Sequence, residues 1–150
     1  MALDQSFVGR TYPPTPAYEV GREKIREFAE AVGDAHPAYV DVDAARALGH
    51  TDVIAPPTFV FSITYRAAGD VVQDPQLGLD YSRVVHGDQK FSYVRPVRAG
   101  DRLTVTSTIE GIKSLAGNDI VDIRGDVHDE SGELVVSALT KLVARAAEEA

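Results

Sequence analysis

The sequence contains no cysteine, no tryptophan and a single methionine among its 150 residues. Without cysteine the chain forms no disulfide, offers no thiolate to a metal and has no thiol nucleophile. Positive charge is also scarce, because 15 Lys and Arg stand against 23 Asp and Glu and give a net charge of −8. Binding to nucleic acid or to an anionic membrane surface depends on clustered basic side chains, so we expect neither partner.

Long apolar runs and targeting segments are missing as well. No stretch approaches the roughly 20 apolar residues that a membrane-spanning helix needs. The first ten residues lack the basic start and apolar stretch of a secretory signal, so we expect a cytoplasmic protein. A chain of 150 residues that is 44% apolar is long enough for one core and short for two. Residues 1–150 are therefore predicted to form a single domain.

The first half of the chain predicts three helices. Between residues 20 and 32, apolar side chains recur at helical spacing with charged ones opposite, and Gly33 follows as a stop. Residues 41–48 predict a short helix. Residues 58–68 follow two prolines and are apolar nearly all round, which predicts a buried helix. Ahead of all three, the proline-rich stretch 12–16 predicts an extended arm on the surface.

The second half predicts four strands joined by glycine-containing turns. They lie near residues 83–94, 102–113, 119–128 and 133–145, which are rich in Val, Ile, Leu and Thr. The third of these alternates apolar and charged side chains, as expected where one face of a sheet meets solvent. The fourth lacks that contrast and predicts coverage on both faces. A helix wrapped by one antiparallel sheet satisfies these patterns, so the predicted class is α+β.

Four fragments resemble one known family. Residues 33–41 read G-D-A-H-P-A-Y-V-D and resemble the signature G-D-x-N-P-x-H-x-D of MaoC-like dehydratases and R-specific enoyl hydratases. In register with it, residues 54–57 read I-A-P-P where that family has I-A-H-G before its central helix. Residues 86–91 and 95–101 resemble the family's next strand and its P-V-x-x-G-D turn. Each fragment is weak alone, but their order and spacing over most of the chain are specific. The resemblance implies a hot-dog fold that holds a fatty acyl thioester in a groove between two subunits.

The resemblance also implies a reaction. In the family, the Asp and His of the signature handle the water and the proton in the reversible dehydration of a β-hydroxyacyl thioester. A base must take the α-proton, an acid must protonate the leaving hydroxide, and a donor must meet the enolate oxygen. A glycine N–H at the start of the central helix polarises the thioester carbonyl with help from the helix dipole.

Carried over residue by residue, the resemblance gives two sets of candidates. The catalytic candidates are Asp34, His36 and Tyr39, and the substrate-binding candidates are Pro57, Thr58, Phe59, Phe61, His86 and Gly87. The expected substrate is an acyl group bound as a thioester to coenzyme A (acyl-CoA) or to acyl carrier protein (acyl-ACP). No cofactor is implied, and the four scattered histidines have no metal-ligand spacing, so we expect no metal.

The family pattern is changed at two positions of the signature and at both prolines, Pro56 and Pro57, of the turn before the central helix. His36 replaces the asparagine of the signature, and Tyr39 replaces the histidine. A tyrosine with its ordinary pKa of about 10 is a poor proton acceptor near neutral pH, where histidine exchanges readily. Pro57 replaces the glycine and has no backbone N–H to offer as an oxyanion donor.

These departures resemble the non-catalytic partner chains of actinobacterial (3R)-hydroxyacyl-ACP dehydratases. We therefore favour a dehydratase subunit that shapes the acyl channel beside a second, catalytic hot-dog chain. One alternative is a self-sufficient homodimeric hydratase that uses Asp34 and His36. Another is an acyl-thioester binding module without turnover.

Ordinary structural roles remain open for the same residues. Asp34 is equally well read as a cap for the turn after the first helix. For His36 we favour a loop histidine that is bonded to backbone. For His86 we favour a role in a structural hydrogen bond. Tyr39 is expected to pack with its hydroxyl bonded, and Phe59 and Phe61 are expected in the core first and the acyl tunnel second.

Overall fold

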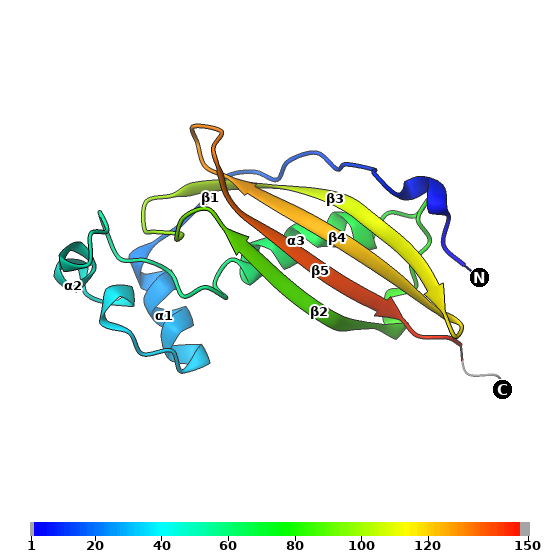
Figure 1. Ribbon diagram of the computed structural model, residues 1–150, viewed down its shortest axis with the longest axis horizontal. Helices are drawn as coiled ribbons and strands as arrows, with labels where there is room; N and C mark the ends of the chain where they lie inside the picture. Colours follow the sequence, from blue (N-terminus) through cyan, green and yellow to red (C-terminus); the bar gives the residue numbers. More distant parts are fainter. Residues whose placement is uncertain (1, 148–150) are drawn as a thin grey trace.

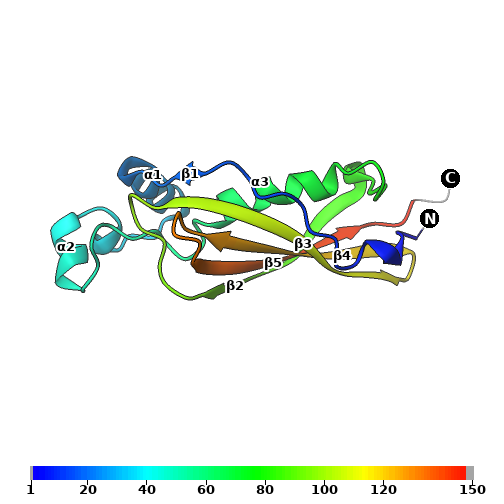
Figure 2. The same cartoon turned by 90° about the horizontal axis from the view of Figure 1, so that it is seen from above.

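A computed structural model describes residues 2–147 of the chain. Five antiparallel strands form one sheet in the order β1-β3-β4-β5-β2, and α3 lies along one face of it (Figures 1 and 2). The strands are β1 (Tyr18–Glu19), β2 (Val84–Tyr93), β3 (Arg102–Leu115), β4 (Asn118–His128) and β5 (Leu134–Ala144). The helices are α1 (Arg22–Val32), α2 (Val42–Ala47) and α3 (Phe61–Val72). The predicted α+β class is confirmed.

Helix α1 is amphipathic, as its spacing predicts. Ile25 and Ala29 are buried, Phe28 packs against the core, and the charged side chains face outward. Val32, at the end of the apolar stripe, is 51% exposed. The stripe therefore reaches beyond the core, and its last member lies on the surface beside the loop that follows.

Helix α3 begins and ends later than the sequence predicts. Residues 57–60 form turns, and the helix continues through Gly69 to Val72. It does so because Ala67, Ala68 and Val71 pack on the sheet and continue the buried face past the glycine. The predicted buried helix is confirmed on the face toward the sheet, whereas Phe61, Tyr65 and Val72 along one side are only half-buried.

The four predicted strands are confirmed within a few residues. In β4 the apolar side chains are buried and the charged ones on the other face are half-exposed, as the alternation predicts. The prediction for the last strand is wrong beyond its start. Val135 and Val136 are both buried, but from Ser137 to Ala144 buried and half-exposed residues alternate.

The two edges of the sheet differ. Along β3, the predicted arm is confirmed as an added extended segment: Tyr12 N–H donates to the Ser107 carbonyl at 2.9 Å, and Thr15 N–H donates to Val105 at 3.0 Å. Figure 1 shows this segment running beside β3. The opposite edge is the ten-residue strand β2, which pairs with β5 on one side. No helix in residues 2–147 combines the length and apolar character needed to cross a membrane.

Candidate active-site groove

The loop after α1 positions the first candidate residue. Gly33 ends the helix in the left-handed conformation with φ of 72°, which glycine adopts without the strain that a Cβ brings. The Asp34 N–H then donates to the Ala29 carbonyl at 2.9 Å. Backbone bonds therefore close the helix end, and the exposed Asp34 side chain follows immediately after it.

Asp34 lies at a groove that three parts of the chain build together. The groove has a volume of about 860 Å³ and is lined by Phe28, Val32, Asp34, Thr58, Phe61, His86, Gln89 and Phe91. These residues come from α1 and its following loop, from the start of α3 and from the edge strand β2. The walls are aromatic and aliphatic, and the few polar groups are a carboxylate, a hydroxyl, an imidazole and an amide. Such a groove suits a ligand with a long apolar part and one polar end.

His86 is held in the groove wall by a short chain of contacts. Its Nε2 lies 3.2 Å from Gln89 Oε1, and the same oxygen accepts a 2.8 Å hydrogen bond from the buried Thr140 hydroxyl. The His86 ring also stacks on Phe61 at 5.4 Å between centroids. Because Gln89 Oε1 is an acceptor, this contact is a hydrogen bond in the tautomer of His86 that has its proton on Nε2. The favoured structural hydrogen bond is present, on a side chain that also faces the groove.

The His36 side chain lines a hollow next to the groove. Its Nδ1 accepts a hydrogen bond from Ala38 N–H at 3.1 Å, so the expected bond to backbone is observed. This bond places the ring proton of neutral His36 on Nε2. The hollow has a volume of about 550 Å³ and is lined by both Asp34 and His36. Asp34 therefore borders two adjacent spaces, of which only the smaller includes His36.

Tyr39 and Pro57 line a separate, smaller hollow of about 340 Å³. Burial raises the pKa of the Tyr39 hydroxyl above its ordinary value, and the nearby Asp34 carboxylate raises it further. Near neutral pH the Tyr39 hydroxyl is therefore ionised even less often than that of an unperturbed tyrosine, so it does not act as a base. The Pro57 carbonyl accepts a hydrogen bond from the Tyr93 hydroxyl, so this peptide contributes an acceptor rather than a donor here.

The groove brings together four of the nine candidate residues, namely Asp34, Thr58, Phe61 and His86. Phe59 lies in the core, as expected first, because its exposed fraction is 0% and its ring packs edge-on against Phe28. Gly87 lies exposed at a bulge in β2 between His86 and Asp88. A Cβ there would approach Val143 Cγ2 at 3.1 Å, so the glycine permits close packing of β2 on β5.

Sequence reasoning missed Gln89 and Phe91 as groove residues. Simple alternation along β2 groups His86 with Asp88 and Lys90. The bulge at Gly87 inserts one residue and moves Gln89 and Phe91 to the side of His86. The H-G pair at the strand start was the available signal, since glycine inside a strand often marks a bulge. Within residues 2–147 no cluster of three or more His, Asp or Glu is arranged to hold a metal ion.

One antiparallel sheet packed against a long helix, with a groove at the helix start and an edge strand beside it, defines a hot-dog protein of the dehydratase type. The chain belongs to the family of FAS1-like proteins, dehydratase domain region, which it matches over residues 6–138. The similarity to MaoC-like dehydratases that the signature predicts is confirmed.

Individual relatives support this placement. A UPF0336 protein from Streptomyces griseus is 93% identical over 150 residues, which is the whole of both chains. A C-terminally truncated HadBC complex from Mycobacterium tuberculosis, a (3R)-hydroxyacyl-ACP dehydratase, contains a chain with a TM-score of 0.83 and 35% identity; the match covers 95% of this chain and 99% of that one. A MaoC-like dehydratase has a TM-score of 0.83 and 34% identity over 95% of this chain and 43% of its own.

Proposed function

We propose that this chain is the channel-forming subunit of a cytoplasmic (3R)-hydroxyacyl thioester dehydratase, which acts beside a catalytic hot-dog subunit. The observation that carries the proposal is the composition of the groove. It has aromatic and aliphatic walls for an acyl chain and one carboxylate, Asp34, at its end, yet lacks the reacting groups that the signature supplies elsewhere.

Two missing groups argue against turnover by this chain alone. Dehydration needs a base for the α-proton, and Tyr39, with a raised pKa, stays protonated at neutral pH. The enolate oxygen needs a donor, and Pro57 has no N–H to offer. Loss of one such donor typically lowers the rate by roughly 10²–10³. Acting together, the two replacements leave a binding site without its main chemistry.

The edge strand β2 supports a proposed binding site for the second subunit. His86, Gln89 and Phe91 lie on β2, so one wall of the groove is also the free edge of the sheet. The opposite edge is already covered by the arm that pairs with β3. A chain that adds to β2 satisfies its unpaired backbone groups and closes the groove from outside. The subunit composition of the HadBC complex is consistent with a partner of the same fold.

The test separates this chain's contribution from that of its partner. The tagged chain is purified from its native host, any co-purifying hot-dog chain is identified by mass, and hydration of crotonyl-CoA and of a longer enoyl-CoA is measured for the chain alone and for the complex. We expect activity only in the complex. Asp34→Asn should leave the kcat of the complex within about twofold, and so should the control Asp70→Asn on the outer surface of α3.

The rival functions predict different results. A homodimer that uses Asp34 and His36 is favoured by one observation, namely that both side chains line the 550 Å³ hollow. It predicts that the chain alone is active and that Asp34→Asn abolishes this activity, an outcome that rejects the partner-subunit proposal. Tight acyl-CoA binding with no turnover, even beside a catalytic hot-dog chain, supports a binding module instead.

A further inference from the structure

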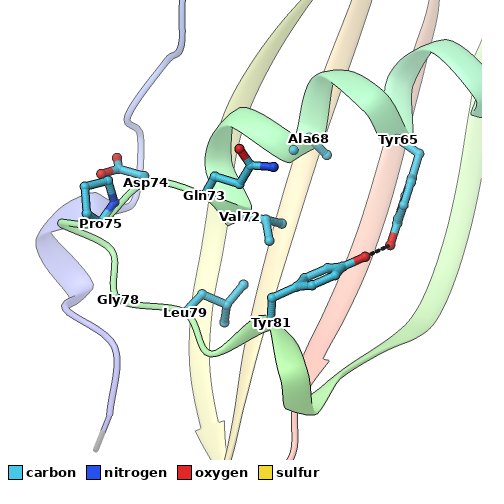
Figure 3. Close-up of a pocket in the computed structure, with 10 residues that line it drawn as sticks. Tyr65, Ala68, Val72, Gln73, Asp74, Pro75, Gly78, Leu79 and Tyr81 are labelled. Carbon is cyan, nitrogen blue, oxygen red and sulfur yellow. Dashed lines mark hydrogen bonds between the residues drawn. The ribbon is translucent and has the colours of Figure 1, made fainter.

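The C-terminal half of α3 borders a further hollow, named the second hollow, which is distinct from the hollows of His36 and Tyr39. It has a volume of about 430 Å³ and is lined by Tyr65, Ala68, Gly69, Val72, Gln73, Asp74, Pro75, Gly78, Leu79 and Tyr81. Figure 3 shows Val72, Leu79 and the two tyrosine rings around it, between α3 and the segment that leads into β2. Most of the lining is apolar. The Asp34 groove lies at the N-terminal end of the same helix, so α3 borders both spaces.

Residues on one side of α3 line both the groove and the second hollow. Phe61, Tyr65, Gly69 and Val72 recur at helical spacing, with Phe61 in the groove and the other three in the second hollow. The Phe61 and Tyr65 rings are 5.0 Å apart. Eleven residues separate Phe61 from Val72, which corresponds to about 16 Å along the helix. The stripe is therefore a continuous apolar wall that leads away from Asp34.

A pair of tyrosines, Tyr65 and Tyr81, stands at the wall of the second hollow. The Tyr65 hydroxyl on α3 and the Tyr81 hydroxyl ahead of β2 lie 3.3 Å apart, and Figure 3 shows the contact crossing the space between the two segments. Tyr81 is exposed and Tyr65 is half-buried. A neutral hydrogen bond open to water contributes little net stability, roughly what the burial of one or two methylene groups contributes. The contact is therefore weak enough for a ligand to separate the two rings.

The far end of the second hollow is polar but already satisfied. The Asp74 carboxylate accepts hydrogen bonds from the Tyr12 hydroxyl at 2.7 Å and from Arg10 at 3.0 Å, both from the N-terminal arm. Its other oxygen accepts the Gln76 N–H at 2.9 Å. These bonds occupy the only charge in the lining, so an apolar end suits the hollow better than a charged one.

We infer that the second hollow binds the distal methylenes of long acyl chains, and that the Tyr65–Tyr81 contact is the boundary between short and long substrates. This inference rests on the proposed acyl-thioester function and adds a length class to it. A short chain ends in the groove beside Phe61. A longer chain parts the tyrosine pair and gains apolar contact with Val72 and Leu79.

The first test fills the hollow without disturbing the groove. A Cβ at Gly69 meets nothing within 4 Å, and leucine is a better helix former than glycine, so Gly69→Leu is expected to fold. Arg66→Leu places the same side chain on the exposed surface of α3 as a control. Binding of hexanoyl-CoA and dodecanoyl-CoA is measured by calorimetry on the chain with any subunit that co-purifies.

Gly69→Leu is expected to weaken dodecanoyl-CoA binding by roughly 16-fold, because each methylene kept out of an apolar site costs about fourfold in affinity and the added side chain displaces about two. Hexanoyl-CoA binding should stay unchanged, and the Arg66→Leu control should affect neither ligand. Equal effects on both ligands, or none on either, overturn the length boundary while acyl binding itself stands. If the unaltered assembly binds neither ligand, the proposed function and this inference fail together.

A second readout uses the absence of cysteine from the chain. Gly69→Cys then carries the only thiol of this chain, at the wall of the second hollow. Dodecanoyl-CoA at saturation should slow the alkylation of this thiol by N-ethylmaleimide, followed by mass spectrometry, by at least about fivefold. Hexanoyl-CoA should not slow it. Equal alkylation rates with the two bound ligands contradict the assignment.

Discussion

Tyr12 illustrates how one polar side chain anchors the N-terminal arm. Its hydroxyl donates to Asp74 at 2.7 Å across 62 residues of sequence. Burial, followed by the hydrogen bond to Asp74 and that residue's charge, raises the pKa of Tyr12 to about 12. The folded protein therefore retains the proton at pH values where the unfolded chain, with a tyrosine pKa near 10, has lost it.

We predict that the contribution of this arm to the free energy of unfolding decreases at alkaline pH. The Tyr12 contribution is complete below about pH 10 and falls as the pH rises from about 10 to about 12, because the unfolded state then binds fewer protons than the folded state. Tyr12→Phe should lower the free energy of unfolding by about 1–2 kcal/mol at pH 8. It should also make the decline above pH 10 shallower.

Urea denaturation at pH 8, 10 and 11 measures both effects. Tyr18→Phe is the control, since the Tyr18 hydroxyl makes no hydrogen bond with residues 2–147. An alkaline decline of the same slope in Tyr12→Phe and in the unaltered chain contradicts the assignment.

At the scale of elements, an ion-pair cluster ties the β2–β3 connection to the β4–β5 turn. Arg95 donates to both oxygens of Asp101, at 2.9 and 3.0 Å, and to Asp129 at 3.2 Å. Asp101 is buried and also accepts Arg98 N–H at 2.9 Å. The cluster fixes two loops at the end of the sheet where the chain turns from β2 toward β3.

We predict that this cluster matters more than the exposed pairs on the same sheet. Asp101→Asn should lower the free energy of unfolding by about 2–3 kcal/mol, because it leaves Arg95 partly buried beside a neutral group. Glu19→Gln, which breaks the exposed pair with Arg102, should cost less than about 1 kcal/mol. Chemical denaturation of both variants tests the contrast, and equal losses would argue against it.

The whole molecule has one covered sheet edge and one open edge. The arm and β1 lie along β3, while β2 ends the sheet on the other side and carries the groove residues. Val85 on β2 is 43% exposed. Long exposed edges that carry apolar side chains are sites where further chains add to a sheet.

We predict that Val85→Lys separates this chain from the proposed partner subunit. A lysine on the open edge opposes strand addition by its charge and its hydration, yet it leaves the buried core intact. Light scattering coupled to size exclusion should show a smaller particle with unchanged far-ultraviolet circular dichroism. Leu115→Lys, at a 66% exposed site on the β3–β4 hairpin, should keep the native mass. A full-sized Val85→Lys assembly would place the interface elsewhere.

How far the sequence predicts this protein depends on the range of the interactions involved. Helical spacing before Gly33 and the alternation in β4 predict their elements because these signals are local. The same local logic gave the wrong start for α3 and failed at the bulge beside Gly87, where pairing with β5 decides which side chains share a face. The signature predicted Asp34 in the groove, whereas Gln89 and Phe91 were missed.

The sequence by itself determined the class of fold and the single antiparallel sheet with its long helix, because periodicity is a local property of each segment. The resemblance to the family signature added that Tyr39 and Pro57 stand where the signature has a histidine and a glycine. Tertiary structure alone decided that His36 and Tyr39 face hollows other than the groove, and that Tyr65 meets Tyr81 across the second hollow. Such placements depend on contacts between segments distant in sequence, whose geometry no local pattern contains.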